Sequence, residues 1–300
     1  MVQPLENVRQ QIDTIDTKIH DLLMERAGLV LQIGAEKKKK GMPIIQPHRE
    51  TAVLRRILAR HEGPLPRESV IRIWRELMGA VSLLQTGLKV AVNVPEGPAG
   101  VTYWDLAKDY FSSVLPMTRL SNPFAALAAV REGEASFAVL PWPEDGEKNP
   151  WWAHMMEESP ADGLHVVARL PFGDPAEKHE NPTHRALVVM RGVYEASDAD
   201  RSFVLLRLPS AVSRARLVEK ADDSGLTVRA IWSADQPGSD SLHLLEVTDY
   251  VSREDDRPGL LLEKLEAREG LCVSIGGYPR PPVYGDKVGK NAITGQNGSF

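Results

Sequence analysis

Cysteine is almost absent from this chain of 300 residues, in which Cys272 stands alone. A single cysteine excludes an intrachain disulfide and a cysteine-based zinc site, and the histidines show no ligand spacing. The sequence also contains no apolar run of membrane-spanning length, no nucleotide-binding motif and no internal repeat. Its first residues lack the charged-then-apolar pattern of a signal peptide. We therefore expect a cytoplasmic protein that binds no metal and no membrane.

The composition is ordinary for a soluble globular protein, with 42% hydrophobic and 26% charged residues. A chain of this length can bury more than one core, so two or three domains are expected. The net charge of -5 conceals an asymmetry, because residues 1–90 hold 15 Lys and Arg against 10 Asp and Glu. A basic first part beside an acidic remainder favours an anionic substrate in the first part. It gives no comparable reason for a nucleic-acid role.

A long amphipathic helix is predicted from about Leu5 to Lys40, where Gly41 and Pro43 end it. Shorter helices are predicted over 47–61 and 67–86. Apolar residues repeat every seven positions in two series along the first helix: Val8, Ile15, Leu22 and Leu29, and Ile12, Ile19 and Ile33. This helix would be about 54 Å long, and the two shorter helices cannot cover its whole stripe. The uncovered part predicts self-association.

Arg26 interrupts this stripe at a position where the second series requires an apolar residue. A guanidinium there needs anionic partners, because an unpaired buried charge is costly. Lys37 follows eleven residues later on nearly the same face. The pair Arg49 and Glu50 precedes the apolar row of the second helix, and Gln85 ends that of the third. Polar groups that converge where apolar stripes meet predict a small, water-excluded pocket for a compact polyanion.

Simpler interpretations of these residues remain open from the sequence. Arg26 could form a structural salt bridge with an acidic neighbour. Lys37 belongs to a run of four lysines at a helix C-terminus, where basic residues complement the helix dipole and add solubility. Arg9 could be an ordinary exposed arginine, since it lies about 25 Å along the helix axis from Arg26.

The segments 5–50 and 70–85 resemble the all-helical class of chorismate mutase over roughly the first 88 residues. The resemblance implies an intertwined helical homodimer that rearranges chorismate to prephenate in aromatic amino-acid biosynthesis. The reaction is unimolecular and pericyclic, so no cofactor is implied. A non-catalytic regulatory protein that keeps the ligand pocket is an alternative.

The resemblance also assigns roles to particular residues. Arg26 and the partner subunit's Arg9 would hold the substrate carboxylates, with Arg49 in support. Lys37 and Gln85 would donate hydrogen bonds to the ether oxygen, and Glu50 would accept one from the hydroxyl. Two further substrate-binding positions depart from the common pattern: Gln46 stands where the family often has Asp, and Val81 where some members have Ser.

Residues 88–198 follow a different pattern, in which strand, helix, helix and strand alternate as in an α/β unit. Two segments, 92–100 and 133–146, resemble the first lobe of prephenate dehydratase, and 164–172 resembles the strand that enters its second lobe. The second lobe is missing, because 181–190 follows at once. This segment resembles the family's Thr-Arg-Phe motif, but reads Thr183, His184, Arg185 and Ala186. We expect a truncated region without dehydratase activity; a bifunctional mutase and dehydratase is the alternative.

Residues 199–281 are predicted to alternate as β-α-β-β-α-β, which resembles an ACT domain, as does the ending IGGYPRP at 275–281. The family's phenylalanine-binding segments correspond to SRARL at 213–217 and IWSAD at 231–235, and both depart from the pattern. Residues 282–300 have no periodicity and are predicted to form a flexible tail. The expected fold is therefore multidomain: an all-α mutase domain over 1–87, followed by α/β and ACT-like α+β regions.

Overall fold

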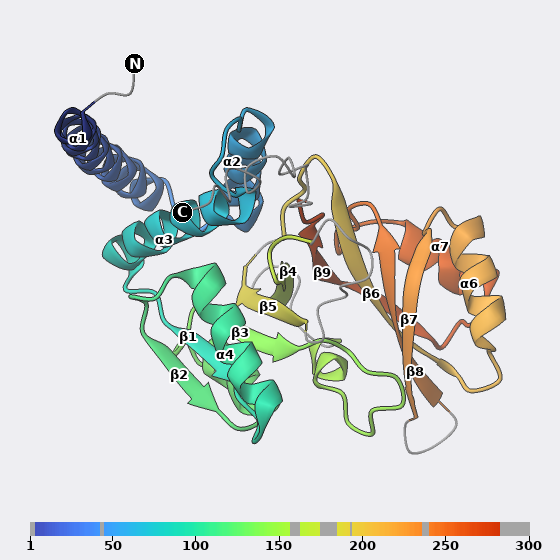
Figure 1. Cartoon of the computed structure of the whole chain (residues 1–300). Helices are drawn as coiled ribbons and strands as arrows, with labels where there is room; N and C mark the ends of the chain where they lie inside the picture. The colour runs from blue at the N-terminus through green and yellow to red at the C-terminus, as the bar shows by residue number, and fades with distance from the viewer. Residues whose placement is uncertain are drawn as a thin grey trace, which may run out of the picture.

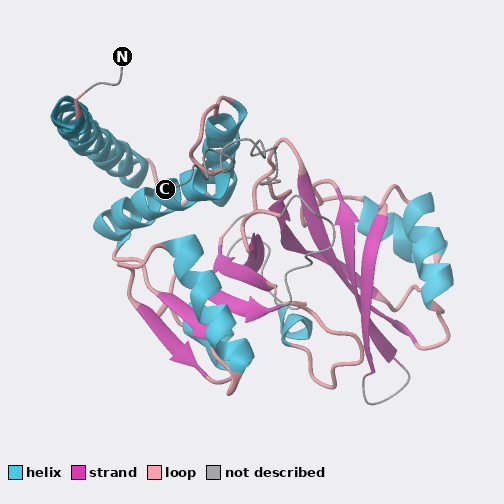
Figure 2. Cartoon of the chain, viewed as in Figure 1, coloured by secondary structure: helices cyan, strands magenta, loops and turns pink. Residues whose placement is uncertain are grey.

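The computed structural model describes residues 4–42, 45–156, 163–174, 185–192, 194–235 and 240–282. Helices alone form the first part of the chain, and a mixed sheet with several helices packed beside it forms the remainder (Figures 1 and 2). The predicted fold class, a helical region followed by mixed α/β structure, is confirmed. The expectations for Thr183, His184 and the tail beyond Pro282 lie outside the described residues.

The helical part consists of α1 (Leu5–Lys39), α2 (Pro47–Ala59) and α3 (Arg67–Thr86). Local signals explain why the predicted ends are nearly right. Pro47 begins α2, where its fixed φ suits the first helical turn. Gly87 ends α3 with a φ of 64°, a left-handed conformation that glycine adopts without steric cost. The end of α2 was placed two residues too late in the sequence-based prediction.

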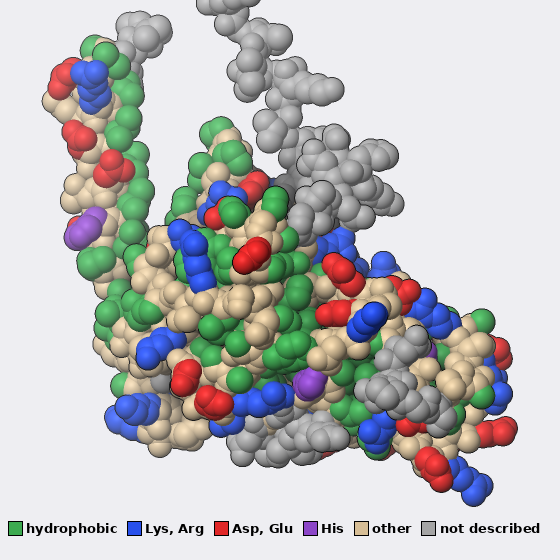
Figure 3. Space-filling model, turned by 90° about the horizontal axis from the view of Figure 1, so that it is seen from below, with side chains coloured by type: hydrophobic (Ala, Val, Ile, Leu, Met, Phe, Trp, Pro, Cys, Tyr) green, Lys and Arg blue, Asp and Glu red, His purple; other side chains and the backbone are tan. Residues whose placement is uncertain are grey.

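Helix α1 projects from the rest of the molecule (Figure 1), and no other described part of the chain covers the apolar residues of its stripe, which are exposed (Figure 3). Gly34 is the only residue of α1 that is buried. Ile15 and Leu29 are each 53% exposed, and Ile19 is 49% exposed. Such a long exposed apolar row is unusual for a monomer, because burying it would be strongly favourable.

The chain then forms an α/β unit: β1 (Val90–Asn93), α4 (Pro98–Phe111), β2 (Met117–Leu120), α5 (Pro123–Arg131) and β3 (Phe137–Pro141). Strand β1 pairs in parallel with both β2 and β3. Asn122 caps α5 by accepting a hydrogen bond of 2.8 Å from the Ala125 amide. Strand β2 corrects the predicted strand-helix-helix-strand order. It is a short edge strand with two exposed residues, so it lacks the apolar signal of its buried neighbours.

A short 3₁₀ helix (Trp151–Met155) precedes β4 (Leu164–Leu170) and β5 (Ala186–Arg191). The last part has the expected β-α-β-β-α-β order: β6 (Asp200–Pro209), α6 (Arg214–Asp223), β7 (Val228–Asp235), β8 (Asp240–Thr248), α7 (Arg257–Lys264) and β9 (Leu271–Pro279). All nine described strands belong to one sheet in the order β2-β1-β3-β5-β4-β9-β6-β8-β7. The two halves of the sheet meet where Val166 of β4 pairs with Gly276 of β9.

Helix α3 packs against both the helical part and the α/β unit, since it contacts α1 and α2 on one side and α4 on the other. A Cβ added to Gly79 would lie 1.9 Å from the carbonyl oxygen of Phe111, so the close approach requires glycine. One turn earlier, Glu76 accepts hydrogen bonds of 2.9 Å from the hydroxyls of Ser112 and Ser113. Arg72 donates a hydrogen bond of 3.1 Å to Asp109. The helical part is thus fixed to the sheet region along the length of α3.

Candidate active site

One cavity lies where the three N-terminal helices meet. Eleven residues line it: Arg26, Val30 and Lys37 from α1; Gln46, Arg49, Glu50 and Val53 from α2 and the position before it; and Met78, Val81, Ser82 and Gln85 from α3. Seven of the eight residues predicted as site residues are therefore brought together. The sequence analysis did not assign the other four lining residues, Val30, Val53, Met78 and Ser82, to the site. Some family members have a serine at the position of Val81. Here the hydroxyl group is supplied by the next residue, Ser82, which also lines the cavity.

Gln46 holds the side chain of Lys37 near the N-terminus of α2, because the Lys37 ammonium donates a hydrogen bond of 2.6 Å to the Gln46 side-chain oxygen. Burial lowers the pKa of Lys37, and the carboxylates of Glu195 and Glu50 act in the opposite direction, whereas Arg49 lowers the pKa further. Lys37 is the member of the lysine run that lines the cavity, whereas Lys38 beside it is exposed. The lining position distinguishes it from a solubilising surface lysine.

Gln85 is oriented by α1, because its amide nitrogen donates a hydrogen bond of 2.6 Å to the carbonyl oxygen of Val30. Gly34 makes this approach possible. A Cβ at that position would lie 2.5 Å from the same amide nitrogen. The missing side chain of Gly34 therefore determines where the Gln85 amide sits.

Arg26 and Arg49 line the cavity together with Lys37, and Glu50 is the only acidic residue among the lining residues. Burial lowers the pKa of Arg26, which means that its charge is partly removed from water. Within the described ranges, Arg26 forms no ion pair, so the salt-bridge interpretation finds no support there. A small cavity with three cations and one carboxylate suits a compact molecule with more than one negative group.

Glu50 accepts a hydrogen bond of 2.9 Å from Nη1 of Arg75, a residue that the sequence analysis missed. Burial raises the pKa of Glu50, while Arg75, Lys37 and His48 each lower it. Arg75 is 2% exposed. From the sequence alone it reads as one of several charged residues on α3, so no local signal marks it.

Arg9 lies on α1 away from the cavity and is exposed. About 25 Å of helix separates it from Arg26, so one chain cannot bring both to a single small ligand. Its predicted role depends on a partner subunit.

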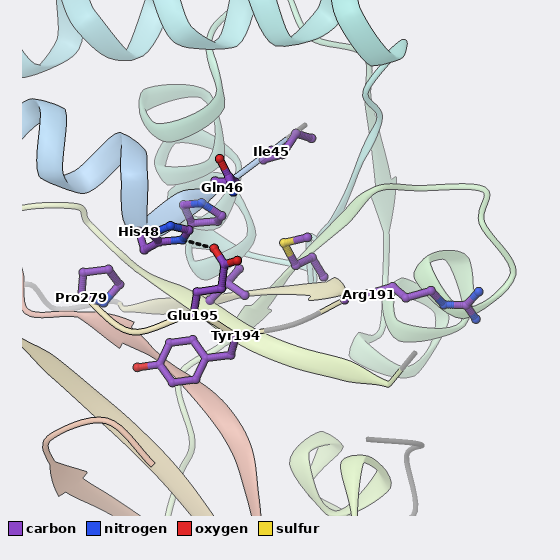
Figure 4. Close-up of a pocket in the computed structure, with 11 residues that line it drawn as sticks. Ile45, Gln46, His48, Arg191, Tyr194, Glu195 and Pro279 are labelled. Atoms are coloured by element: carbon purple, nitrogen blue, oxygen red, sulfur yellow. Dashed lines mark ion pairs between the residues drawn. The ribbon is translucent and has the colours of Figure 1, made fainter. Parts of the chain in front are cut away.

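A neighbouring cavity lies between the start of α2 and the sheet, and it shares Gln46 with the first (Figure 4). His48 forms an ion pair of 2.8 Å with Glu195, and Figure 4 shows the two side chains facing each other. Arg191 points away from this pair, and its guanidinium donates a hydrogen bond of 2.6 Å to the carbonyl oxygen of Arg131. The His48–Glu195 pair therefore joins α2 to the segment after β5, and the residues that line this second cavity do not form a second cluster of cations.

The segments 213–217 and 231–235 are joined to each other by a hydrogen bond. Arg214 donates a hydrogen bond of 2.8 Å to the Ser233 hydroxyl, and it also pairs with Asp145 from the loop after β3. Ser233 in turn lies 2.7 Å from Nδ1 of His243. These polar groups are thus engaged within the protein.

The comparisons with known proteins cover the part of the chain that contains this cavity. The family model described as chorismate mutase type II matches residues 8–86. The bifunctional chorismate mutase/prephenate dehydratase of Aquifex aeolicus is 31% identical over 144 residues, which cover 47% of this chain and 39% of the relative. That of Neisseria gonorrhoeae is 46% identical over 89 residues, which cover 30% of this chain and 24% of the relative. The chain therefore carries a chorismate mutase type II domain at its N-terminus and is homologous to the bifunctional enzymes.

The matched segments span less than two fifths of these relatives' own length. Among solved structures, prephenate dehydratase from Streptococcus mutans is similar with a TM-score of 0.43 and 14% identity, covering 66% of this chain and 100% of that chain. No helix in the described part of the chain is long and apolar enough to cross a membrane. The same residues contain no group of three or more His, Cys, Asp or Glu side chains that could hold a metal ion.

Proposed function

We propose that this protein is a chorismate mutase, which rearranges chorismate to prephenate in the cavity between α1, α2 and α3. The observation that carries the proposal is the convergence of seven polar and apolar side chains, separated by up to 59 positions, on one cavity of the matched domain. The rearrangement is unimolecular, so the chain needs no nucleophile and no cofactor. It has to hold the reactive conformer and stabilise the charge that separates in the transition state.

Each cavity residue then has a distinct task. Arg26 and Arg49 bind carboxylates, for which a planar and permanently charged guanidinium is suited. Lys37 and Gln85 donate hydrogen bonds to the ether oxygen as negative charge grows on it. Glu50 accepts a hydrogen bond from the substrate hydroxyl. Gln46 orients Lys37 through their hydrogen bond, and Val81 packs against the substrate ring.

The proposed active form is a homodimer formed through α1. Support comes from the exposed apolar row along α1 and from the distance of Arg9 from the cavity of its own chain. A second copy of α1 would bury the row, and the partner subunit's Arg9 would complete the carboxylate site.

The division of the chain remains a proposal as well: a mutase domain over 1–87, a truncated dehydratase-like region over 88–198, an ACT-like domain over 199–281 and a tail over 282–300. The β-α-β-β-α-β order of the third part supports the ACT-like assignment. The unpaired cysteine at 272 supports a reducing, cytoplasmic location.

A direct assay tests the proposal: chorismate consumption followed together with prephenate and phenylpyruvate formation. We expect prephenate from the wild-type protein, and a loss of about 100-fold or more in kcat/KM for Arg26→Ala with unchanged helicity. Arg56→Ala, an exposed arginine of α2 outside the cavity, is the matched control and should keep full activity. Wild-type activity in Arg26→Ala would refute the assignment. Absence of turnover by the wild type would favour a non-catalytic regulatory protein, and phenylpyruvate formation a bifunctional enzyme.

A further inference from the structure

Arg75 is among the largest side chains that the described part of the protein fully buries, and it lies directly behind the proposed site. It is 2% exposed, and its Nη1 donates to Oε2 of Glu50 at 2.9 Å. Its Nε and Nη2 have no hydrogen-bond partner among the described residues. A guanidinium in such a place is retained against a substantial desolvation cost, which suggests a task beyond packing.

Two aromatic rings from the sheet region hold this guanidinium. Its central carbon lies 4.0 Å from the ring centroid of Tyr110 and 4.1 Å from that of Phe172. Tyr110 belongs to α4, and Phe172 follows β4. The negative faces of aromatic rings attract a cation and replace part of the hydration that burial removes. Neither ring belongs to the matched mutase domain.

We infer that Arg75 is a positioning residue for the mutase reaction, which holds the Glu50 carboxyl group in place as an oriented hydrogen-bond acceptor. We also infer that Tyr110 and Phe172, which hold Arg75, make the sheet region a working part of the mutase site. The inference rests on the proposed function, because it deepens the role of Glu50 in that site.

The geometry explains how Arg75 acts through Glu50. The hydrogen bond from Arg75 occupies Oε2, so Oε1 stays available to a hydroxyl in the cavity. A substrate with two carboxylates would itself oppose ionisation of Glu50, and the buried cation behind the carboxylate offsets that effect.

Three charged groups on the surrounding elements act on the pKa of Glu50, which burial raises overall. Burial raises its pKa, while Arg75 of α3, Lys37 of α1 and His48 of α2 lower it. Tyr110 of α4 faces the same pair, and burial raises the pKa of its phenol, so it stays neutral. Arg75 has the largest charge effect on Glu50. Removing Arg75 therefore raises the pKa of Glu50 further. As the pH falls, the carboxylate of this variant becomes protonated at a higher pH than in the wild-type protein.

The test is the pH profile of kcat/KM for chorismate in the full-length protein. For Arg75→Met we expect the acidic limb to move upward by about one pH unit or more, the usual effect of one close opposite charge. Arg75→Lys keeps a positive charge, so its acidic limb should lie close to the pH at which the wild-type limb lies. Arg72→Met is the matched control, since Arg72 lies one turn earlier on α3 and also pairs with α4, through Asp109, but does not touch Glu50.

Two further variants separate positioning from mere stabilisation. Phe172→Leu leaves the ion pair and removes one ring, so it should shift the limb in the same direction by less. It also replaces Arg75→Met if that variant does not fold. In the Glu50→Gln background, Arg75→Met should cause little additional loss of kcat/KM, because Arg75 acts through Glu50.

An unmoved acidic limb in folded Arg75→Met or Phe172→Leu, or full additivity with Glu50→Gln, would overturn the inference while leaving the mutase assignment intact. Absence of chorismate turnover by the wild-type protein would overturn both.

Discussion

The Lys37 ammonium and the Gln46 side-chain oxygen are joined across the turn between α1 and α2 by a hydrogen bond of 2.6 Å. This contact links the last turn of the long helix to the residue that precedes the second helix. It fixes the direction of a flexible side chain before any ligand arrives. Preorganised donors of this kind account for much of the rate enhancement in enzymes that stabilise a developing charge.

Replacing Lys37 by Met should reduce kcat/KM for chorismate by on the order of 100- to 1000-fold, because it removes a positioned, charged donor. Lys38→Met is the control, since Lys38 is the adjacent member of the lysine run and is exposed. Burial lowers the pKa of Lys37, so its proton is lost below the usual pH range of lysine. Wild-type activity should therefore fall as pH rises through that lowered value, and Lys37→Arg should abolish this alkaline limb. Equal rates for the Lys37→Met and Lys38→Met proteins would contradict the assigned role.

Gly34→Ala should displace the Gln85 amide, since the new methyl group would lie 2.5 Å from its nitrogen. That atom is the end of a flexible side chain, so it can move away at small cost to stability. We expect kcat/KM to fall at least about tenfold, with little change in the melting temperature.

Gly28→Ala on the same helix is the control, because a Cβ there meets nothing within 4 Å. It should stabilise the helix by up to about 1 kcal/mol and leave the rate unchanged. Thermal unfolding by circular dichroism and steady-state kinetics on both variants check the pair. A Gly34→Ala protein with a normal rate would show that the amide position is not critical.

The sequence was sufficient for features that depend on neighbours along the chain. The helix ends at Pro47 and Gly87 follow from local backbone chemistry, and the break that Arg26 makes in the apolar stripe is visible in the heptad spacing. Arg75 could not be found in this way, because Glu50, Tyr110 and Phe172 reach it from distant parts of the chain. The edge strand β2 was missed for the opposite reason: it is exposed, so burial leaves no pattern in its sequence.

Mixing two inactive variants should restore activity if the site is shared between subunits. In a heterodimer of Arg9→Ala and Arg26→Ala chains, one site would keep both arginines and the other would lose both. With random reassortment, half of the dimers would be mixed, so about a quarter of the wild-type activity should return after joint refolding. Refolding each variant alone is the control. Absence of recovery, with heterodimers verified by mass spectrometry, would exclude a shared site.

We expect the region over 88–198 not to dehydrate prephenate, because it lacks room for the second lobe that would close a cleft. Strands β4 and β5 are direct antiparallel neighbours, and the chain between Leu170 and Ala186 is only 15 residues long. A β-α-β unit alone needs about 30 residues. A surface with one wall cannot exclude water or hold a general acid against the leaving hydroxyl. Phe172, from the start of this short connection, instead contacts Arg75 behind the mutase cavity.

The measurement is phenylpyruvate formation from prephenate at neutral pH, with protein from a host that lacks other dehydratases. The same preparation must turn over chorismate, which shows that it is folded. Phenylpyruvate formed well above the spontaneous rate, and lost in Thr183→Ala, would prove that the shortened region keeps a dehydratase site.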